Sequence, residues 1–232
     1  MKNREGFMKL NDAITIDGPV ASGKTTVGKQ LAEKLGYQFL DTGVMYRAVT
    51  LAVIEGKIDL HDENAVSEKA EQIKIEILPS TQKDGRQNDV FVDGEEVTTK
   101  LWENNVRDAV SLVSTYKRVR QALTEKQRQI GLQGKIVMVG RDIGTVVLPD
   151  AEHKFFLIAS VEERARRRFQ EIKASGKKAD LAEIQHALEE RDKIDSSRKL
   201  APLIAAQDAK IINTNDKTVQ QVVLEILNSI QE

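Results

Sequence analysis

The chain has 232 residues, with 35 basic and 36 acidic side chains and a formal net charge of −1. This balance gives no support for nucleic acid or an anionic membrane as the main partner. The absence of cysteine excludes disulfides, thiolate metal sites and a cysteine nucleophile. No apolar run approaches the roughly 20 residues of a membrane span. We expect a monomeric cytoplasmic protein, with a flexible leader over residues 1–12.

A glycine-rich loop follows the first apolar segment, residues 13–16. Residues 18–25 read G-P-V-A-S-G-K-T and fit the phosphate-loop pattern G-x-x-x-x-G-K-T. Apolar residues at helical spacing come next, so the context is strand, loop and helix N-terminus, which surrounds phosphates with backbone N–H groups. We expect Lys24 to reach the β- and γ-phosphates and Thr25 to ligate Mg²⁺. A strand–turn–helix with incidental glycines is the alternative. The candidate ATP-binding residues are Gly18, Pro19, Val20, Ala21, Ser22, Gly23, Lys24, Thr25 and Thr26.

Strands and helices alternate along the rest of the chain. Further strands are predicted at 37–40, 136–139, 155–158 and 210–212, and helices at about 44–55, 162–175, 181–194 and 218–230. The run at 136–139 is wholly apolar, as in strands buried on both faces of a parallel sheet. This alternation predicts an α/β fold with a doubly wound, five-stranded parallel sheet, whose ligands bind beyond the carboxyl ends of the strands.

One segment departs from this alternation. Ile73, Ile75 and Ile77 alternate with polar residues, which predicts a strand solvated on one face. A second strand at 90–92 meets the hairpin signal Asp93-Gly94, and residues 80–89 between the two resemble a surface loop. A helix carrying apolar residues 106, 110 and 113 follows. We predict an inserted antiparallel lobe over 67–108 that grips the substrate, within a core domain formed by 13–66 and 109–230. The alternative is an insertion that has no part in substrate binding.

Charged residues occur where the ligand crevice must lie. Arg141 and Asp142 follow a buried strand, and Arg47 lies on the helix after the second strand. Arg191, Asp195 and Arg198 are four and three residues apart, so one helical face can present them together. Phosphoryl transfer needs such cations around the developing charge. A single surface arginine is more often a solvated side chain than a ligand, whereas a buried strand rarely delivers charges such as Arg141 and Asp142 to its end by accident, so we expect these two to be functional.

Five motifs together resemble the bacterial cytidylate kinases, nucleoside monophosphate kinases that phosphorylate CMP and dCMP. They are I-T-I-D-G-P at 14–19, L-D-T-G with M-Y-R at 40–47, G-R-D-I-G-T-V-V at 140–147, E-E-R-A-x-R-R at 162–168 and E-R-D-x-x-D-x-x-R at 190–198. The resemblance extends from about residue 13 to residue 223. The third and fifth motifs are much more specific than the phosphate loop, which indicates only a nucleotide.

The resemblance implies a role for each matching residue. Lys24, Arg47, Arg141, Arg164 and Arg168 would be catalytic, the last two on a short lid at about 164–182. The residues that would bind CMP are Thr42, Arg47, Ser111, Arg120, Arg141, Asp142, Arg191, Asp195 and Arg198. Among these, Asp142, Arg120 and Ser111 would read the cytosine edge, while Arg191 and Asp195 would contact the ribose. Residues 213–216 would lie near the adenine of ATP.

Two other functions stay open at this point. A kinase with the same phosphate loop could accept another nucleoside monophosphate such as UMP, or a small metabolite alcohol. A GTP-binding switch would need an N-K-x-D guanine reader and a D-x-x-G motif, and the sequence contains neither. The sequence therefore favours a nucleoside monophosphate kinase that uses ATP and Mg²⁺.

Overall fold

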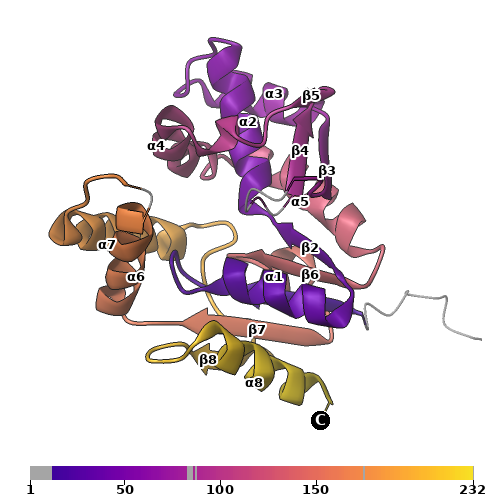
Figure 1. Cartoon of the computed structure of the whole chain (residues 1–232). Coiled ribbons are helices and arrows are strands. Elements are labelled where there is room, and N and C mark those ends of the chain that lie inside the picture. The colour runs from indigo at the N-terminus through magenta and orange to yellow at the C-terminus, as the bar shows by residue number, and fades with distance from the viewer. Residues whose placement is uncertain (1–11, 83–85, 87, 175, 232) are drawn as a thin grey trace, which may run out of the picture.

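The computed structural model describes residues 12–82, 86, 88–174 and 176–231 (Figure 1). The predicted leader lies outside the described residues, apart from Asp12.

A five-stranded parallel sheet lies at the centre of the fold, in the strand order β2-β6-β1-β7-β8. Its strands are β1 (Ala13–Asp17), β2 (Gln38–Asp41), β6 (Ile136–Gly140), β7 (His153–Ile158) and β8 (Lys210–Asn213). All five predicted strands are confirmed. In the register, Asp17 lies beside Gly140 and Asp41 beside Val139. The carboxyl ends of β1, β2 and β6 therefore meet at one edge, where α/β sheets bind their ligands.

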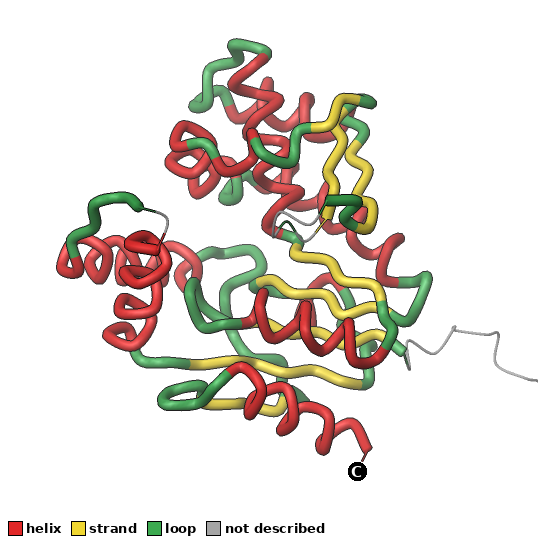
Figure 2. The backbone as a smooth tube through the Cα atoms, in the orientation of Figure 1, coloured by secondary structure: helices red, strands yellow, loops and turns green. Residues whose placement is uncertain are grey.

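Two apolar cores cover the two faces of this sheet. Side chains alternate across β6: Ile136 and Met138 belong to one core, whereas Val137 and Val139 belong to the other. The second core is closed by α1 (Lys24–Leu35) and α8 (Val219–Gln231), which lie along the sheet in Figure 2. The first core is closed by α2 (Gly43–Glu55) and α5 (Lys117–Gly131). Because both faces are covered, the central strand β6 is apolar and buried along its whole length.

A second, three-stranded sheet is antiparallel, in the order β3-β4-β5. Its strands are β3 (Ile75–Pro79), β4 (Asn88–Val92) and β5 (Glu95–Glu96), and it gathers with α3 (Glu63–Gln72), the 3₁₀ turn η1 (Lys100–Trp102) and α4 (Asn104–Val113) away from the main sheet (Figure 1). Asp93 and Gly94 have φ of 51° and 89°, the left-handed pair that a tight hairpin needs. The predicted hairpin and the helix with its buried valines are confirmed, while the boundaries 67–108 stay a prediction.

Several predicted boundaries are wrong. Ile73 does not belong to the strand: it ends α3 and is buried in the first core. The loop predicted at 80–89 is shorter, because Asn88 and Asp89 already pair with β3; residues 83–85 and 87 of that loop lie outside the described part. Tyr37 precedes β2, since its N–H caps α1 by donating to Ala32 O at 2.9 Å. Helices α3 and α5 are not among the predicted elements.

The last part of the chain carries two helices that pack against each other. They are α6 (Val161–Ala174) and α7 (Leu181–Ser197). The Asp180 carboxylate caps α7 by accepting from Ala182 N at 2.8 Å and Glu183 N at 3.0 Å. Helix α7 continues three residues beyond the predicted end, so that Asp195 lies inside it. One π-helical turn, η2 (Ile143–Val147), follows β6.

Candidate active site

The phosphate loop connects β1 to α1, as its sequence predicts. Gly18, Ala21 and Gly23 have φ of 152°, 59° and 92°. A Cβ on Gly18 would lie 2.3 Å from Leu157 O, so only glycine fits there. Gly23 is the N-cap of α1 and accepts from Val27 N at 2.9 Å. In this backbone conformation, the first N–H groups of α1 are available to bind an anion such as a phosphate.

Lys24 is buried at the start of α1. Its Nζ donates to Pro19 O at 2.8 Å, which closes the loop on itself. Burial lowers the pKa of Lys24 well below its usual value, and the nearby charge of Arg141 lowers it further. Lys24 of the phosphate loop and Arg141 after β6 are therefore close enough to repel each other, and an anion placed between them would relieve this repulsion.

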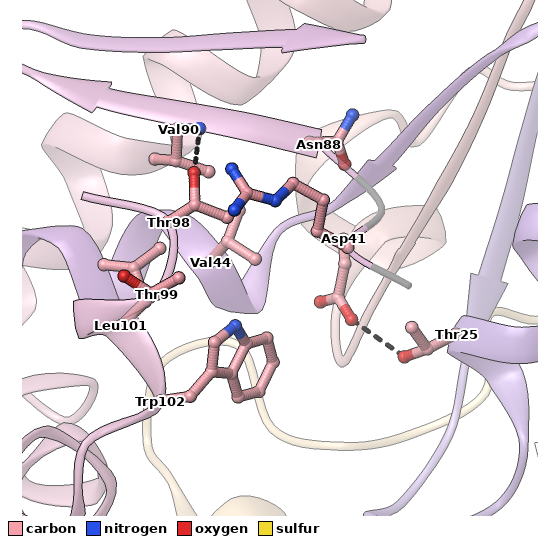
Figure 3. Close-up of a pocket in the computed structure, with 10 residues that line it drawn as sticks. Thr25, Asp41, Val44, Asn88, Val90, Thr98, Thr99, Leu101 and Trp102 are labelled. Atoms are coloured by element: carbon pink, nitrogen blue, oxygen red, sulfur yellow. Dashed lines mark hydrogen bonds between the residues drawn. The ribbon is translucent and has the colours of Figure 1, made fainter. Parts of the chain in front are cut away.

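Thr25 and Asp41 form the oxygen-rich side of the crevice. Thr25 Oγ1 donates to Asp41 Oδ2 at 2.8 Å, and the other carboxylate oxygen accepts from Gly43 N at 2.9 Å. Both side chains line a cavity of about 320 Å³ that reaches to the inserted sheet and Trp102 (Figure 3). One hydroxyl and one oriented carboxylate suit Mg²⁺, which keeps several waters and takes its remaining ligands from phosphates. The residues thus fit the metal that the sequence predicts.

Asp17 is a buried carboxylate that the sequence analysis missed. Its Oδ1 accepts from Ile143 N at 2.9 Å and its Oδ2 from Gly144 N at 2.8 Å. Burial raises the pKa of Asp17 to about 6 despite these two bonds. The carboxylate fixes the turn after β6 and so determines where Arg141 and Asp142 project.

Three arginines meet on one fully buried carboxylate, that of Asp195. Arg141 Nε donates to Asp195 Oδ2 at 2.9 Å. Arg191 Nε lies 3.2 Å from Asp195 Oδ1, and Arg198 donates to the same oxygen. The Nε atoms of Arg191 and Arg198 are buried without a hydrogen-bond partner. Buried donors are normally satisfied, so this arginine cluster (Arg141, Arg191, Arg198) has donor capacity left for an anionic ligand.

A second buried ion pair joins Arg120 of α5 to Asp142. Arg120 Nη2 donates to Asp142 Oδ2 at 2.7 Å, and Nη1 donates to Ser114 O at 3.1 Å. The guanidinium also lies over the Tyr46 ring, 5.4 Å from its centroid. Ser111 is half-buried on α4 and its carbonyl accepts from Ser114 Oγ at 2.8 Å. The residues predicted to read a base therefore lie in one neighbourhood.

Arg47 and Thr42 extend from α2 and its N-cap into the same region. Arg47 Nη1 donates to Leu101 O at 3.3 Å, and burial lowers the pKa of Arg47 to about 10. The charges of Asp41 and Arg191 both act on it. The Thr42 hydroxyl instead donates to Val139 O at 3.0 Å. Thr42 thus ties α2 to β6.

The two predicted lid arginines occupy different surroundings. Arg164 is buried: it donates to Val20 O of the phosphate loop at 3.2 Å and to both carboxylate oxygens of Asp192 at 2.5 and 3.2 Å. Arg168 is more exposed and pairs with Glu171 at 2.9 Å, although its charge still lowers the pKa of Arg47. Of these two arginines, Arg164 contacts the phosphate loop and Arg168 does not.

A second hollow, of about 440 Å³, lies between the start of α6 and the loop after β8. Its lining residues are Ser160, Glu162, Glu163, Arg166, Leu181, Asn215 and Asp216. It includes part of the segment at 213–216 that the sequence analysis connects with adenine. Arg167 joins the two sides, since it donates to Thr214 Oγ1 at 3.0 Å, and that hydroxyl in turn donates to Ser22 O.

A phosphate loop at the carboxyl edge of a parallel sheet, facing a group of arginines, defines a kinase with the P-loop fold. A model of the cytidylate kinase family matches residues 14–232. The chain belongs to the cytidylate kinase family, and it is a nucleoside monophosphate kinase rather than a GTP-binding switch.

Individual relatives agree with this assignment over nearly the full length. The cytidylate kinase of Ligilactobacillus salivarius is 47% identical over 219 residues, covering 94% of this chain and 96% of that protein. Those of Caldanaerobacter subterraneus and Bacillus subtilis are 44% and 42% identical, each covering 97% of this chain and 97% and 99% of the relative. Among solved structures, an uncharacterised protein from Eubacterium ventriosum superposes with a TM-score of 0.50 at 12% identity, covering 94% of this chain and 97% of that one; this likeness concerns the fold alone.

No helix among the described residues is long and apolar enough to cross a membrane.

Proposed function

We propose that the chain transfers the γ-phosphoryl group of ATP to CMP or dCMP. An oxygen of the acceptor's phosphate attacks the γ-phosphorus in line, the bond from the γ-phosphorus to the bridging oxygen breaks, and ADP leaves with that electron pair. The observation that carries the proposal is the convergence of the arginine cluster on the buried Asp195 carboxylate, with the buried Nε of Arg198 still without an acceptor. Membership of the cytidylate kinase family supports the choice of acceptor.

The acceptor's phosphate is assigned to Arg47, Arg141 and Arg198. Its attack on ATP brings two anions together, and the barrier falls when fixed cations offset their repulsion. Arg141 supports this role because its charge already acts on Lys24 of the donor loop. We assign Lys24 to the β- and γ-phosphates, with Arg164 and Arg168 supplying further positive charge from the lid. The attacking oxygen is already ionised, so no side chain needs to remove a proton.

Cytosine is assigned to the Arg120–Asp142 pair. Cytosine offers an amine donor, which a carboxylate accepts, and the O2 and N3 acceptors, to which an arginine donates. Asp142 uses one oxygen for Arg120, which leaves the other for the amine. Uracil presents a carbonyl in place of that amine and would confront the carboxylate with a second acceptor, so UMP is the weaker candidate. We assign Ser111 to the same edge and Thr42 to the phosphate side.

Arg191 and Asp195 are assigned to the ribose of the acceptor. Asp195 is fully buried and already surrounded by the arginine cluster, so a sugar hydroxyl can donate to it without a further charge being buried. When the acceptor's phosphate enters, it competes with Asp195 for Arg141 and Arg198. We infer that this exchange brings the guanidinium groups onto the acceptor.

The donor side is assigned to the loop residues 18–26, Thr25 and the hollow beside residues 215 and 216. Thr25 and Asp41 would hold Mg²⁺ together with ATP, and the ion would supply positive charge at the β- and γ-phosphates. The Thr25–Asp41 hydrogen bond of 2.8 Å supports this, because it holds the hydroxyl oxygen and one carboxylate oxygen close together. Adenine would fill the hollow of about 440 Å³ between α6 and the β8–α8 loop.

We assign substrate gripping to the inserted lobe at 67–108 and donor closure to the lid at about 164–182, on the core formed by 13–66 and 109–230. Every residue assigned above belongs to one chain, so we infer that a monomer is sufficient for activity. We place this activity in the cytoplasm, where nucleotides are phosphorylated.

A coupled ADP-release assay across CMP, dCMP, UMP and AMP tests the proposal. We expect kcat/KM for CMP to exceed that for UMP by more than about tenfold, in line with discrimination by a polar site. Asp142→Asn should narrow this preference, since an amide can donate to the uracil carbonyl. Equal or better turnover of UMP or AMP by the wild type would refute the assignment of the base.

A further inference from the structure

Trp102 is the only tryptophan of the chain and lies beside Arg47. Arg47 Cζ is 4.5 Å from the centroid of the indole ring. The Trp102 residue is 52% exposed, although it is the largest apolar side chain on the inserted lobe. A guanidinium held over an indole face at this distance is a cation–π contact, and tryptophan gives the strongest one.

The turn that carries Trp102 is firmly anchored. Leu101 is fully buried in the first core, and Trp102 N donates to Thr99 O at 3.2 Å. Lys100 Nζ donates to Glu55 Oε1 at 3.0 Å, which links the turn to the end of α2. Because Arg47 also lies on α2, the indole and the guanidinium are held on two elements that are tied together.

Arg47 differs in its partners from the other candidate acceptor arginines. Each member of the arginine cluster pairs with Asp195, whereas Arg47 forms no ion pair within the described ranges and is held by an indole face and the Leu101 carbonyl. An aromatic face attracts a cation but carries no net charge. Among the described residues, an incoming phosphate therefore meets no paired carboxylate at Arg47, whereas at Arg141 and Arg198 it competes with Asp195.

The same indole borders the crevice. Trp102 lines the cavity of about 320 Å³ together with Thr25 and Asp41 (Figure 3). A ligand that fills the crevice or moves Arg47 will therefore change the surroundings of the ring, and the emission of this one tryptophan can report it.

We propose that Trp102 is a positioning residue that holds the Arg47 guanidinium where the acceptor's phosphate binds. The proposal rests on the assignment of Arg47 to that phosphate. Removal of the ring frees Arg47 among the neighbouring cations Arg107 and Arg191, which repel it. The bound phosphate draws Arg47 back into place, so the cost of losing the ring falls on binding of the acceptor: KM rises and kcat stays nearly unchanged.

Steady-state kinetics of Trp102→Leu, Trp102→Phe and a matched control test this. We expect Trp102→Leu to raise KM for CMP by about three- to twentyfold, the range of cation–π contacts, with kcat and KM for ATP within about twofold of wild type. Trp102→Phe keeps an aromatic face and should stay within about threefold. Leu224→Ala removes an equally exposed apolar side chain on α8 and should change none of these constants. The Arg47→Ala background provides the decisive comparison: there, Trp102→Leu should add less than about twofold, because the partner is gone.

Each result has a definite meaning. Wild-type KM in Trp102→Leu, or an effect of equal size in the Arg47→Ala background, overturns the proposal, the latter because it would show a merely structural role. Should Trp102→Leu not fold, titration of wild-type tryptophan emission with CMP decides: no change at concentrations where calorimetry detects bound CMP overturns it as well. A wild type that phosphorylates UMP but not CMP refutes the assignment of the base instead, and the same comparison is then made with UMP, since Arg47 acts on the phosphate.

Discussion

The strongest test of the arginine cluster is the substitution Asp195→Asn. The change keeps the shape of the side chain and removes its charge, which leaves three guanidinium groups close together around a neutral amide. Asp195 is fully buried, so water cannot replace the lost carboxylate. The folded state should therefore lose much of its stability in the absence of nucleotide.

The magnitude follows from the partners of Asp195. Removing one member of a buried ion pair costs about 3–5 kcal/mol. The side chains of Arg141 and Arg191 are each 21% exposed, so water screens part of their repulsion and we expect the lower end, about 3 kcal/mol. In a protein of this size, 1 kcal/mol shifts Tm by about 2–4 °C. The expected fall in Tm is thus about 6–12 °C.

Thermal unfolding with and without inorganic phosphate measures this effect. Phosphate should raise the Tm of Asp195→Asn more than that of the wild type, because an anion replaces the missing charge. Glu190→Gln is the matched control: it breaks the exposed pair with Lys193 on the same helix and should shift Tm by less than about 2 °C, since surface pairs contribute little. A Tm of Asp195→Asn within 2 °C of wild type, with an equal response to phosphate, would refute the reasoning.

Three further predictions concern the crevice. Lys24→Ala should lower kcat by about a hundred- to a thousandfold, the usual loss of one charge-stabilising donor; a loss below tenfold in the coupled assay would contradict its assigned role. Asp41→Asn should raise the Mg²⁺ concentration for half-maximal activity by about tenfold or more, and an unchanged Mg²⁺ titration would exclude Asp41 from the metal site. Burial raises the pKa of Asp17 from 3.8 to about 6, so the stability from this group is present below pH 3.8 and is lost as pH rises through about 6. Urea unfolding of wild type and Asp17→Asn at pH 4 and pH 7 should show the wild-type advantage falling by roughly 2.4 kcal/mol, from 1.36 kcal/mol per pKa unit with part of the effect already lost at pH 4, whereas a constant difference would disprove the shift.

The sequence predicts the main sheet well because its central strands β1 and β6 are short, mainly apolar and buried on both faces. It does not reveal α5, whose buried stripe contains Arg120 and Gln127 beside Val119 and Leu123. Two polar residues in that stripe weaken the apolar periodicity on which the prediction depends. Arg120 can be buried because Asp142, on a distant segment, neutralises it, and no local pattern contains that information.

The candidate site also contains residues that could be predicted from the sequence and residues that could not. Arg141 and Asp142 could be predicted, since charges directly after an apolar strand lie at the ligand edge. Asp17 is a charge at the carboxyl end of the apolar strand β1 and could have been found in the same way. Asp192 and Trp102 could not, because their roles come from contacts with Arg164 and Arg47, which lie 28 and 55 positions away along the chain.

The position of Arg164 has a consequence for how the two substrates influence each other. One guanidinium joins the Val20 carbonyl of the donor loop to Asp192 of α7, the helix that also presents Arg191 and Asp195. A shift of either segment therefore strains the same side chain. Occupancy of one nucleotide site should therefore alter the apparent affinity of the other. In double-reciprocal plots of initial rate, the lines for different concentrations of the second substrate should intersect off the horizontal axis. This mutual effect on KM should become smaller in Arg164→Lys.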